Sequence, residues 1–326
     1  MEDSALRLNP AVRDTLASHM IMLDKVRRRV DEFDILHFHI ELLHAPLVRE
    51  FADRTLTTLH GRLDLPDLIP FYGAFGDLPL SSISNHQQGY LRNVNWMGTV
   101  YHGLPGDLLP SPKAAGYLAF IGRIAPEKRP DHAIEIATRS SMPLKIAAKI
   151  DRAHQAYWDE KIRPMVEANS EVEFMGEIGE SEKAGFLGGA AALLFPIDWP
   201  EPFGLVMIEA MACGTPVIAY RRGSVPEIIQ NNGSGFVVDT IEEAITAVRR
   251  HAHCPQARTA LVYSSVSNSQ VLVSISFETW AFSQQDAEPS PRSDPIAPVP
   301  ASKLPPHAFQ AAKCANYFSH AGYAPI

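Results

Sequence analysis

Apolar and polar positions alternate along the first 250 residues in a way that is typical of an α/β fold. Short apolar runs bounded by Gly, Pro or Asn indicate buried strands, and amphipathic runs of helical period indicate helices. In the first part of the chain, helices are expected at Asn9–Val30, with Asn9-Pro10 as cap and first turn, and at Leu43–Ala52. Strands are expected at Phe33–Ile40, Thr55–Leu59, Leu80–Ser84 and Trp96–Tyr101.

The same alternation continues after a Pro/Gly-rich stretch at Pro105–Pro112, which reads as an interdomain linker. Helices fall between the next strands, and the last helix, Ile241–Arg250, is acidic at its start and basic at its end, as the helix dipole favours. Alternating strands and helices of this length predict a parallel, doubly wound sheet. These strands are expected at Gly116–Ile121, Leu144–Ala148, Val172–Met175, Leu193–Phe195, Val217–Ala219 and Phe236–Val238.

The pattern therefore divides the chain into residues 1–112, 113–250 and 251–326. The last part is rich in proline, poor in charge and without a sustained helical period. Such a composition is typical of a disordered tail. A second hypothesis is that the reading frame changes near residue 250, and sequencing the encoding DNA decides between them.

Composition narrows the function classes. A formal net charge of -8 argues against nucleic acid or an anionic membrane as the main partner. No apolar run has the length of a membrane span, which leaves peripheral membrane contact open. The three cysteines form no spaced framework, so we expect reduced thiols and a cytoplasmic location.

The strongest chemical signal lies in residues 200–219, PEPFGLVMIEAMACGTPVIA. An apolar strand precedes this block, and a loop, a short helix and a second strand follow one another within it. Gly204 lets the backbone approach a ligand, and the free amides and dipole of the helix start favour a phosphate. Glu201 and Glu209 flank that helix start, and carboxylates accept hydrogen bonds from sugar hydroxyls. The block predicts a ligand that has both phosphate and sugar.

A second element, Ile121–Lys128, follows a predicted strand. Arg123 and Lys128 place two cations at a strand-to-helix junction, where they suit a diphosphate and would stabilise its charge as a leaving group. By contrast, His37 and His39 share one face of their strand, as two zinc ligands would, but no third ligand follows at a clear spacing. A structural or cleft-lining role is the favoured interpretation for these two histidines.

The Glu201-x7-Glu209 block resembles the E-x7-E signature of the family-four (group 1) retaining glycosyltransferases of GT-B fold. Gly122-Arg123-x-x-Pro126-Glu127-Lys128 is similar to a second element of that family. The resemblance covers roughly residues 10–250 and implies two Rossmann-like, doubly wound domains. It implies that residues 1–112 form the acceptor-side domain and residues 113–250 the nucleotide-sugar domain.

The resemblance also implies roles for single residues. By this resemblance, the diphosphate would be bound by the Arg123 and Lys128 cations and by the backbone at Gly204 and Leu205. Glu201 would bind the transferred sugar beside the reacting carbon. Glu209 would bind the ribose, with Phe203 in the same sugar-binding set.

Three further segments match family elements. His60, in Thr57-Thr58-Leu59-His60-Gly61, resembles the strand-end histidine that contacts the donor sugar near the reacting carbon. Asp34–His39 looks like the D-x-x-H-x-H element near the cleft. The segment Met175, Gly176, Glu177 and Ile178 is expected to line the nucleobase pocket.

A family member of this fold normally opens with a strand and a glycine-rich loop, whereas residues 1–30 contain no glycine. We therefore expect an N-terminally truncated first domain that is poorly packed. A catalytically impaired fragment that still binds nucleotide is accordingly one alternative. Another GT-B enzyme, such as a sugar-nucleotide epimerase or a phosphorylase, is a second.

The expected reaction is transfer of a sugar from a nucleotide-diphosphate sugar to an unidentified saccharide, lipid or small-molecule acceptor. Retaining enzymes of this fold are usually written with front-face attack, in which a donor phosphate oxygen takes the acceptor proton. No cofactor is expected beside the donor. No metal is expected either, because the cations take its place and no Asp-x-Asp pair stands on a suitable loop.

Overall fold

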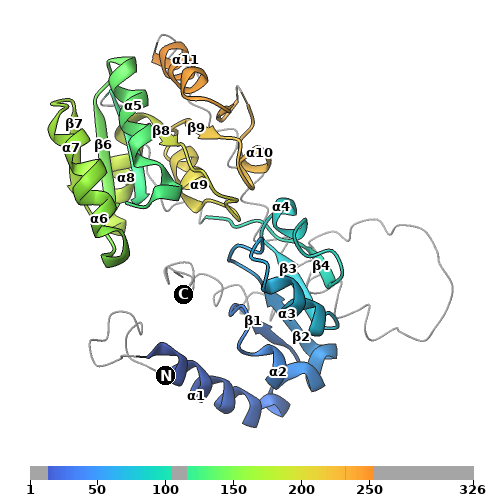
Figure 1. Cartoon of the computed structure of the whole chain (residues 1–326). Coiled ribbons are helices and arrows are strands. Elements are labelled where there is room, and N and C mark those ends of the chain that lie inside the picture. Colours follow the sequence, from blue (N-terminus) through green and yellow to red (C-terminus); the bar gives the residue numbers. More distant parts are fainter. Residues whose placement is uncertain (1–13, 105–115, 232, 253–326) are drawn as a thin grey trace. The chain divides into compact units, whose positions relative to one another are not determined.

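The computed structural model describes residues 14–104, 116–231 and 233–252, which separate into two compact units (Figure 1). The first unit holds residues 14–83 and 88–100. The second holds residues 84–87 together with the described residues from 101 to 252. The expected linker at Pro105–Pro112 and the tail after residue 252 lie outside the described residues.

The first unit is built on a parallel sheet with the strand order β1-β2-β3-β4. All four expected strands are present, each shorter than expected. Helix α4 (Asn85–Gln88) precedes the last of them, and three of its residues belong to the second unit. The other elements are α1 (Thr15–Arg28), β1 (Leu36–Phe38), α2 (Ala45–Val48), β2 (Thr55–Thr58), α3 (Leu68–Ala74), β3 (Pro79–Ser82) and β4 (Asn95–Thr99).

Two expected helices in this unit were wrong in extent. The first helix begins at Thr15, because Asp14 is extended and its carboxylate accepts a hydrogen bond from the Leu16 amide at 2.8 Å. The expected cap, Asn9-Pro10, lies outside the described residues. The expected helix Leu43–Ala52 is helical only over Ala45–Val48 and continues as a 3-10 segment, Arg49–Arg54, in which Phe51 leaves helical geometry.

Buried apolar side chains in the first unit form two small clusters. One comprises Leu23, Val30, Leu36, Phe38 and Val48 beneath α1 and α2. The other comprises Leu59, Leu63, Tyr72, Leu80 and Leu91 around β2, β3 and α3. Both clusters are smaller than the core of the second unit, so the described residues of the first unit bury less apolar surface than those of the second.

The second unit is a six-stranded parallel sheet with the order β10-β9-β8-β5-β6-β7. The six expected strands are confirmed at β5 (Tyr117–Arg123), β6 (Leu144–Lys149), β7 (Val172–Gly176), β8 (Ala190–Phe195), β9 (Val217–Tyr220) and β10 (Gly235–Val238). The chain runs outward from β5 to β7 and then returns to place β8 on the other side of β5. The order of the strands therefore reverses between β5 and β8.

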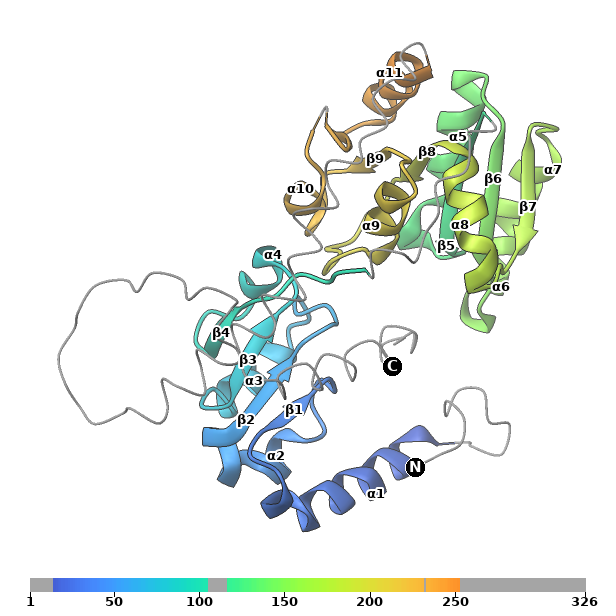
Figure 2. The same cartoon turned by 180° about the vertical axis from the view of Figure 1, so that it is seen from behind.

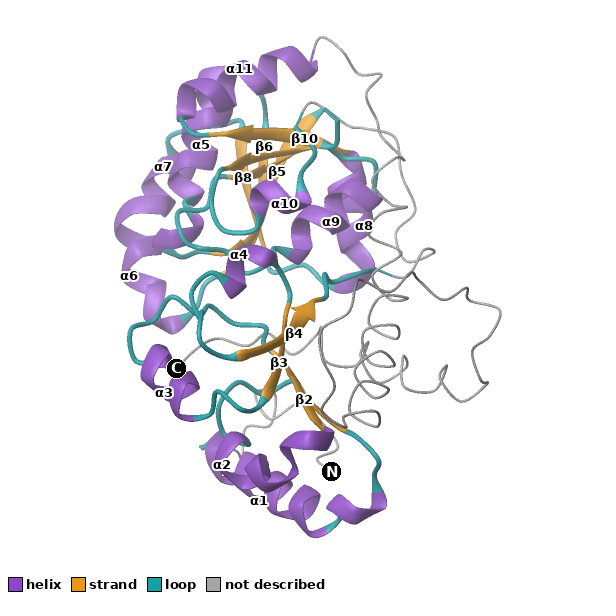
Figure 3. Cartoon of the chain, turned by 90° about the vertical axis from the view of Figure 1, so that its right-hand side faces the viewer, coloured by secondary structure: helices purple, strands orange, loops and turns teal. Residues whose placement is uncertain are grey.

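Helices cover both faces of this sheet (Figure 2, Figure 3). Helices α5 (Pro130–Ser140), α7 (Arg163–Glu167) and α11 (Ile241–Ala252) lie on one face. Helices α8 (Glu180–Gly189) and α9 (Leu205–Ala212) lie on the other, followed by the short α10 (Val225–Ile228). A short helix, α6 (Gln155–Tyr157), and a π-helical turn, Trp158–Ile162, precede α7.

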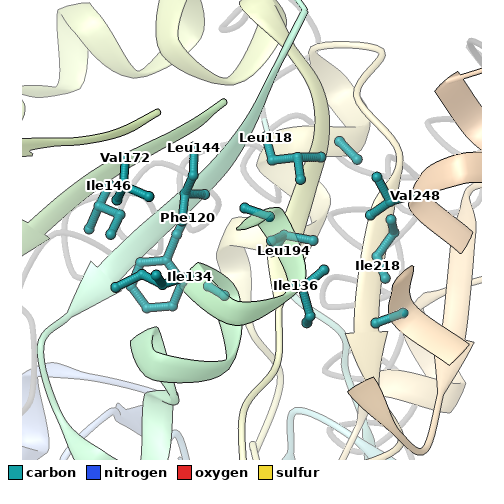
Figure 4. Close-up of a cluster of buried hydrophobic side chains, with 14 of the residues drawn as sticks. Leu118, Phe120, Ile134, Ile136, Leu144, Ile146, Val172, Leu194, Ile218 and Val248 are labelled. Carbon is teal, nitrogen blue, oxygen red and sulfur yellow. The ribbon is translucent and has the colours of Figure 1, made fainter. Parts of the chain in front are cut away.

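The core of the second unit lies between its sheet and the helices α5, α7 and α11 (Figure 4). Leu118, Phe120, Leu144 and Ile146 alternate along β5 and β6, and they pack against Ile134 and Ile136 of α5 and Val248 of α11. Period-two alternation directs the strand residues to this layer, and on α5 the residues Ala133, Ile136 and Ala137 share one face at i, i+3 and i+4 spacing. The expected doubly wound α/β fold is confirmed.

None of the described helices is both long enough and apolar enough to cross a membrane.

Candidate functional site

The candidate site of the second unit lies where its strand order reverses. Strands β5 and β8 are hydrogen-bonded parallel neighbours, so their carboxyl ends lie at the same edge of the sheet. In doubly wound sheets, ligands bind at this edge beside such a reversal. Arg123 is the last residue of β5, the loop after β5 carries Lys128, and the loop after β8 carries Glu201. The two loops are joined directly, because the Asp198 amide donates to the Glu127 carbonyl at 2.8 Å.

Lys128 and Glu201 meet in this site. Lys128 ends the 3-10 turn Pro126–Lys128, and its Nζ lies 2.8 Å from Oε2 of Glu201. The indole Nε1 of Trp199 donates to the same oxygen at 2.8 Å, and the Lys128 ammonium lies 4.3 Å from the centre of the Trp199 ring. Only 16% of the Lys128 side chain and 11% of the Glu201 side chain are exposed, so both charges are largely withdrawn from water.

The backbone of Glu201 is held as firmly as its side chain. Its carbonyl accepts a hydrogen bond from the Ser224 amide at 2.9 Å. Gly223 has a φ of +54°, and a Cβ there would lie 2.2 Å from the Glu201 carbonyl oxygen. Only glycine permits this approach. The loop that begins at Gly223 therefore packs directly against the backbone of Glu201.

Gly204 and Leu205 form the start of α9, as the sequence predicts. Gly204 has a φ of +79° and ends the loop, and Leu205 is the first helical residue. The first amides of a helix have no acceptor within it and carry the positive end of its dipole. An anion binding here would lie next to the β5–β8 edge.

Glu209 projects from α9 toward α8 and pairs with Lys183. The Lys183 Nζ lies 2.9 Å from Glu209 Oε1 and 3.0 Å from Glu180 Oε2. Burial disfavours the charged ammonium, but the pairs with Glu209 and Glu180 outweigh it, and the pKa of Lys183 is raised. Helices α8 and α9 are direct neighbours, which explains how residues distant in the sequence meet (Figure 2).

Arg123 is the last residue of β5, and its ion-pair partners are residues other than Glu201 and Glu209. Its guanidinium lies 3.7 Å from Glu127 and 3.8 Å from Asp151, and 31% of the side chain is exposed. These pairs are long, so they hold the guanidinium weakly and leave it able to take a stronger anion. The structure thus places Arg123 at the expected strand end without an ion pair to Glu201 or Glu209 among the described residues.

The remaining predicted residues of this unit differ in their exposure. Phe203 is 2% exposed, and its ring packs edge-on against His102 at 4.9 Å, so its side chain contributes packing rather than a ligand surface. Met175 is 42% exposed at the end of β7, and Gly176 turns the chain there with a φ of +76°. Glu177 is exposed and Ile178 is half-buried.

The first unit carries the predicted His60 directly after β2. His60 Nε2 lies 2.8 Å from Nδ1 of His39, which follows β1, and the Glu41 carboxylate accepts from the backbone amide of His60 at 2.8 Å. His37 contacts Thr58 at 2.9 Å, and the His37 and His39 rings are 4.3 Å apart, as their shared face predicts. No cluster of three metal-ligating side chains occurs among the residues that the structure describes.

Sequence reasoning missed three residues of these sites: Trp199, Lys183 and Glu41. Trp199 lies two residues before Glu201 and directly before the block at 200–219, so a block that began one residue earlier would have included it. Lys183 and Glu41 carried no such signal. A lysine near the start of a helix and a glutamate after a strand are ordinary surface residues until their partners are known.

The fold is the GT-B fold of glycosyltransferases of known structure. Among solved structures, sucrose-phosphate synthase from Thermosynechococcus elongatus is similar with a TM-score of 0.64 and 19% identity, covering 87% of this chain and 83% of that one. HepE from Anabaena, solved in complex with UDP, is similar with a TM-score of 0.61 and 17% identity, covering 84% of this chain and 83% of that one.

The sequence comparison finds a family match over part of the chain. Residues 109–265 match the family described as "Glycosyl transferases group 1". A D-inositol 3-phosphate glycosyltransferase from Streptomyces bingchenggensis is 32% identical over 154 residues, which are 42% of this chain and 30% of the relative. The alignment thus spans about a third of the length of the curated relatives that the chain matches. The E-x7-E and Gly-Arg blocks both lie within the matched residues 109–265.

Proposed function

We propose that this protein is a retaining glycosyltransferase that uses a nucleotide-diphosphate sugar as donor. The observation that carries the proposal is the Lys128–Glu201 pair beside the start of α9, at the edge where the strand order reverses. A cation, a helix start and two carboxylates in one region match the chemistry of a diphosphate joined to two sugars. The family match of residues 109–265 supports the same donor class.

Each residue then has a role. Arg123, Lys128 and the backbone at Gly204–Leu205 hold the diphosphate and stabilise the charge that develops on it as it leaves. Glu209 accepts hydrogen bonds from the ribose hydroxyls, and Glu201 accepts them from the transferred sugar. His60 contacts that sugar near its anomeric carbon. The backbone of Met175–Ile178 lines the nucleobase site.

In the proposed reaction, the bond from the anomeric carbon to the donor phosphate oxygen breaks, and the acceptor hydroxyl oxygen bonds to the same face. The acceptor proton passes to the leaving phosphate. A covalent glycosyl-enzyme would need a carboxylate beneath the sugar ring, whereas the proposal gives Glu201 the role of accepting hydrogen bonds from the sugar hydroxyls. A metal-independent reaction and a cytoplasmic location stay predictions from the sequence.

Single-turnover transfer tests the proposal. The named relatives suggest UDP-sugars as first donors and an inositol phosphate among the acceptors, and GDP- and ADP-sugars complete the donor panel. We expect a product with the anomeric configuration of the donor, readable by NMR, and undiminished turnover in EDTA. Inverted configuration would contradict retention, and binding of a nucleotide sugar without transfer to any acceptor would favour the impaired binding fragment.

The Glu201→Gln variant separates a transition-state contact from a ground-state contact. The amide accepts hydrogen bonds from sugar hydroxyls more weakly and cannot balance the Lys128 charge. We expect kcat to fall by roughly 10- to 100-fold, since a hydrogen bond to a charged group contributes about 1.5–3 kcal/mol, while donor affinity changes less. Equal losses in kcat and affinity would show that Glu201 binds the ground state only.

A further inference from the structure

Glu41 makes an unusual contact with the backbone that carries His60. Its Oε1 accepts hydrogen bonds from the amides of both His60 and Gly61, each at 2.8 Å. The backbone of Glu41 is itself anchored, because the Tyr72 hydroxyl donates to the Glu41 carbonyl at 3.1 Å. One carboxylate oxygen therefore binds two successive amides in a neighbouring loop.

The position of the two amides explains why they need this acceptor. Strands β1 and β2 are parallel neighbours, so Glu41 and His60 both follow the carboxyl end of their strands. Leu59 donates the last hydrogen bond from this strand toward β3, to the Ser81 carbonyl at 2.9 Å. The amides of His60 and Gly61 lie beyond that ladder, where backbone donors need another partner. Glu41 supplies it.

The glycine after His60 fits the same arrangement. A Cβ on Gly61 would lie 3.3 Å from Glu41 Oε1, closer than nearly all real contacts of this kind. The imidazole of His60 is held separately, by its contact with His39 Nδ1 at 2.8 Å. Glu41 fixes the backbone of His60, and His39 contacts its ring.

We propose that Glu41 is a positioning residue that orders His60 for sugar transfer, an inference that rests on the role given to His60 under the proposed function. Glu41 acts through the two amides and does not itself touch the substrate. A misplacement of a substrate-contacting group by about 1 Å can lower a rate by about 100-fold, so a backbone tie of this kind affects turnover.

A variant series with activity readouts tests the proposal. Glu41→Ala removes the acceptor, whereas Glu41→Gln keeps a carbonyl oxygen that can accept from both amides. We expect Glu41→Ala to lower kcat by 10- to 100-fold with donor Kd unchanged, and Glu41→Gln to retain turnover within about threefold. Glu50→Ala, which removes an exposed carboxylate paired with Arg27 in the same unit, is the matched control and should leave kcat unchanged.

A double-mutant cycle with His60→Ala shows whether Glu41 acts through His60. We expect Glu41→Ala to cause no further loss of kcat in the His60→Ala background. A further loss as large as in the wild-type background, or an unchanged kcat in Glu41→Ala, would overturn the proposal.

Amide hydrogen exchange tests the positioning role of Glu41 without a measurement of sugar transfer. In Glu41→Ala, the amides of His60 and Gly61 should exchange with solvent at least tenfold faster, and the His60 ring resonances should shift, whereas Glu41→Gln should resemble the wild type. Unchanged exchange and ring shifts in Glu41→Ala would overturn the positioning role. If the wild type transfers no sugar, the proposed function fails, and the exchange result still decides whether Glu41 orders His60.

Discussion

Lys128 and Glu201 are 73 residues apart in the sequence, and their side chains form a 2.8 Å ion pair that the Trp199 indole completes. The pair is partly buried, so each residue compensates the charge of the other while the donor is absent. A diphosphate near Lys128 would compete with Glu201 for the ammonium. The carboxylate would then be released toward sugar hydroxyls, which links donor binding to the orientation of Glu201.

The Lys128→Ala variant should bind nucleotide sugars more weakly. The substitution removes the proposed diphosphate contact and also leaves the Glu201 carboxylate without its cation. The expected loss in affinity is roughly 10- to 100-fold, measured by calorimetric titration, because a charge-assisted contact contributes about 1.5–3 kcal/mol. Lys145→Ala is the matched control, since it removes a lysine of the same unit that pairs with Glu173 on the neighbouring strand. Affinity within twofold of the wild type would contradict the role of Lys128.

The Lys183→Ala variant should destabilise the second unit. It leaves Glu209, whose side chain is 13% exposed, without its cation. We expect a loss of about 1–3 kcal/mol in the free energy of unfolding, measured with urea. Glu180→Gln removes only the more exposed partner of Lys183 and should cost less than about 1 kcal/mol. Equal effects of the two variants would indicate that the Lys183–Glu209 pair contributes no special stability.

The Gly223→Ala variant should disturb the loop that carries Glu201. The new Cβ would lie 2.2 Å from the Glu201 carbonyl oxygen and 2.4 Å from its nitrogen, at a φ that side chains disfavour. We expect a loss of about 2–4 kcal/mol in the free energy of unfolding, together with weaker donor binding.

Gly185→Ala is the control for that substitution. Gly185 lies within α8, and the space that an added Cβ would occupy has no other atom within 4 Å. Alanine is favoured over glycine within a helix, so we expect a gain of about 0.5–1 kcal/mol. Thermal unfolding of both variants checks the contrast, and a neutral Gly223→Ala would refute the close approach of the two backbones.

His44 makes the stability of the first unit depend on pH. It is 1% exposed, and its Nε2 lies 2.7 Å from the Thr57 hydroxyl oxygen. Burial lowers the pKa of His44 to about 4. The unfolded chain, with a pKa of about 6.5, therefore binds more protons than the folded one between these values. The contribution of the uncharged His44 to the free energy of unfolding is therefore complete above about pH 6.5, and it is lost as the pH falls toward 4.

The His44→Gln variant isolates this effect, since its amide reaches toward Thr57 but does not titrate. When the pH is lowered from 7.5 to 5, the wild type should lose about 2 kcal/mol of unfolding free energy relative to the variant. Urea unfolding at both pH values measures it. A difference that is independent of pH would show that His44 titrates alike in the folded and unfolded chains.

Local sequence pattern predicted most of the secondary structure. Strands such as β5 and β9 are short apolar runs bounded by glycine or proline, and that signal requires no knowledge of the rest of the chain. Helix limits were less predictable. The start of α1 depends on the Asp14 cap, and α2 passes at Arg49 into a 3-10 segment within which Phe51 leaves helical geometry.

The sequence by itself determined the alternation of strands and helices. It also determined which glycines turn the chain, at 204 and 223, and which charged residues follow the strands. Only the tertiary structure decided which of those charges meet. The strand order places the loops after β5 and β8 side by side and so pairs Lys128 with Glu201, while α8 brings Lys183 to Glu209 and β1 brings Glu41 to the His60 amide. Pairing across parallel strands and between packed helices depends on sheet order, which no local period in the chain encodes.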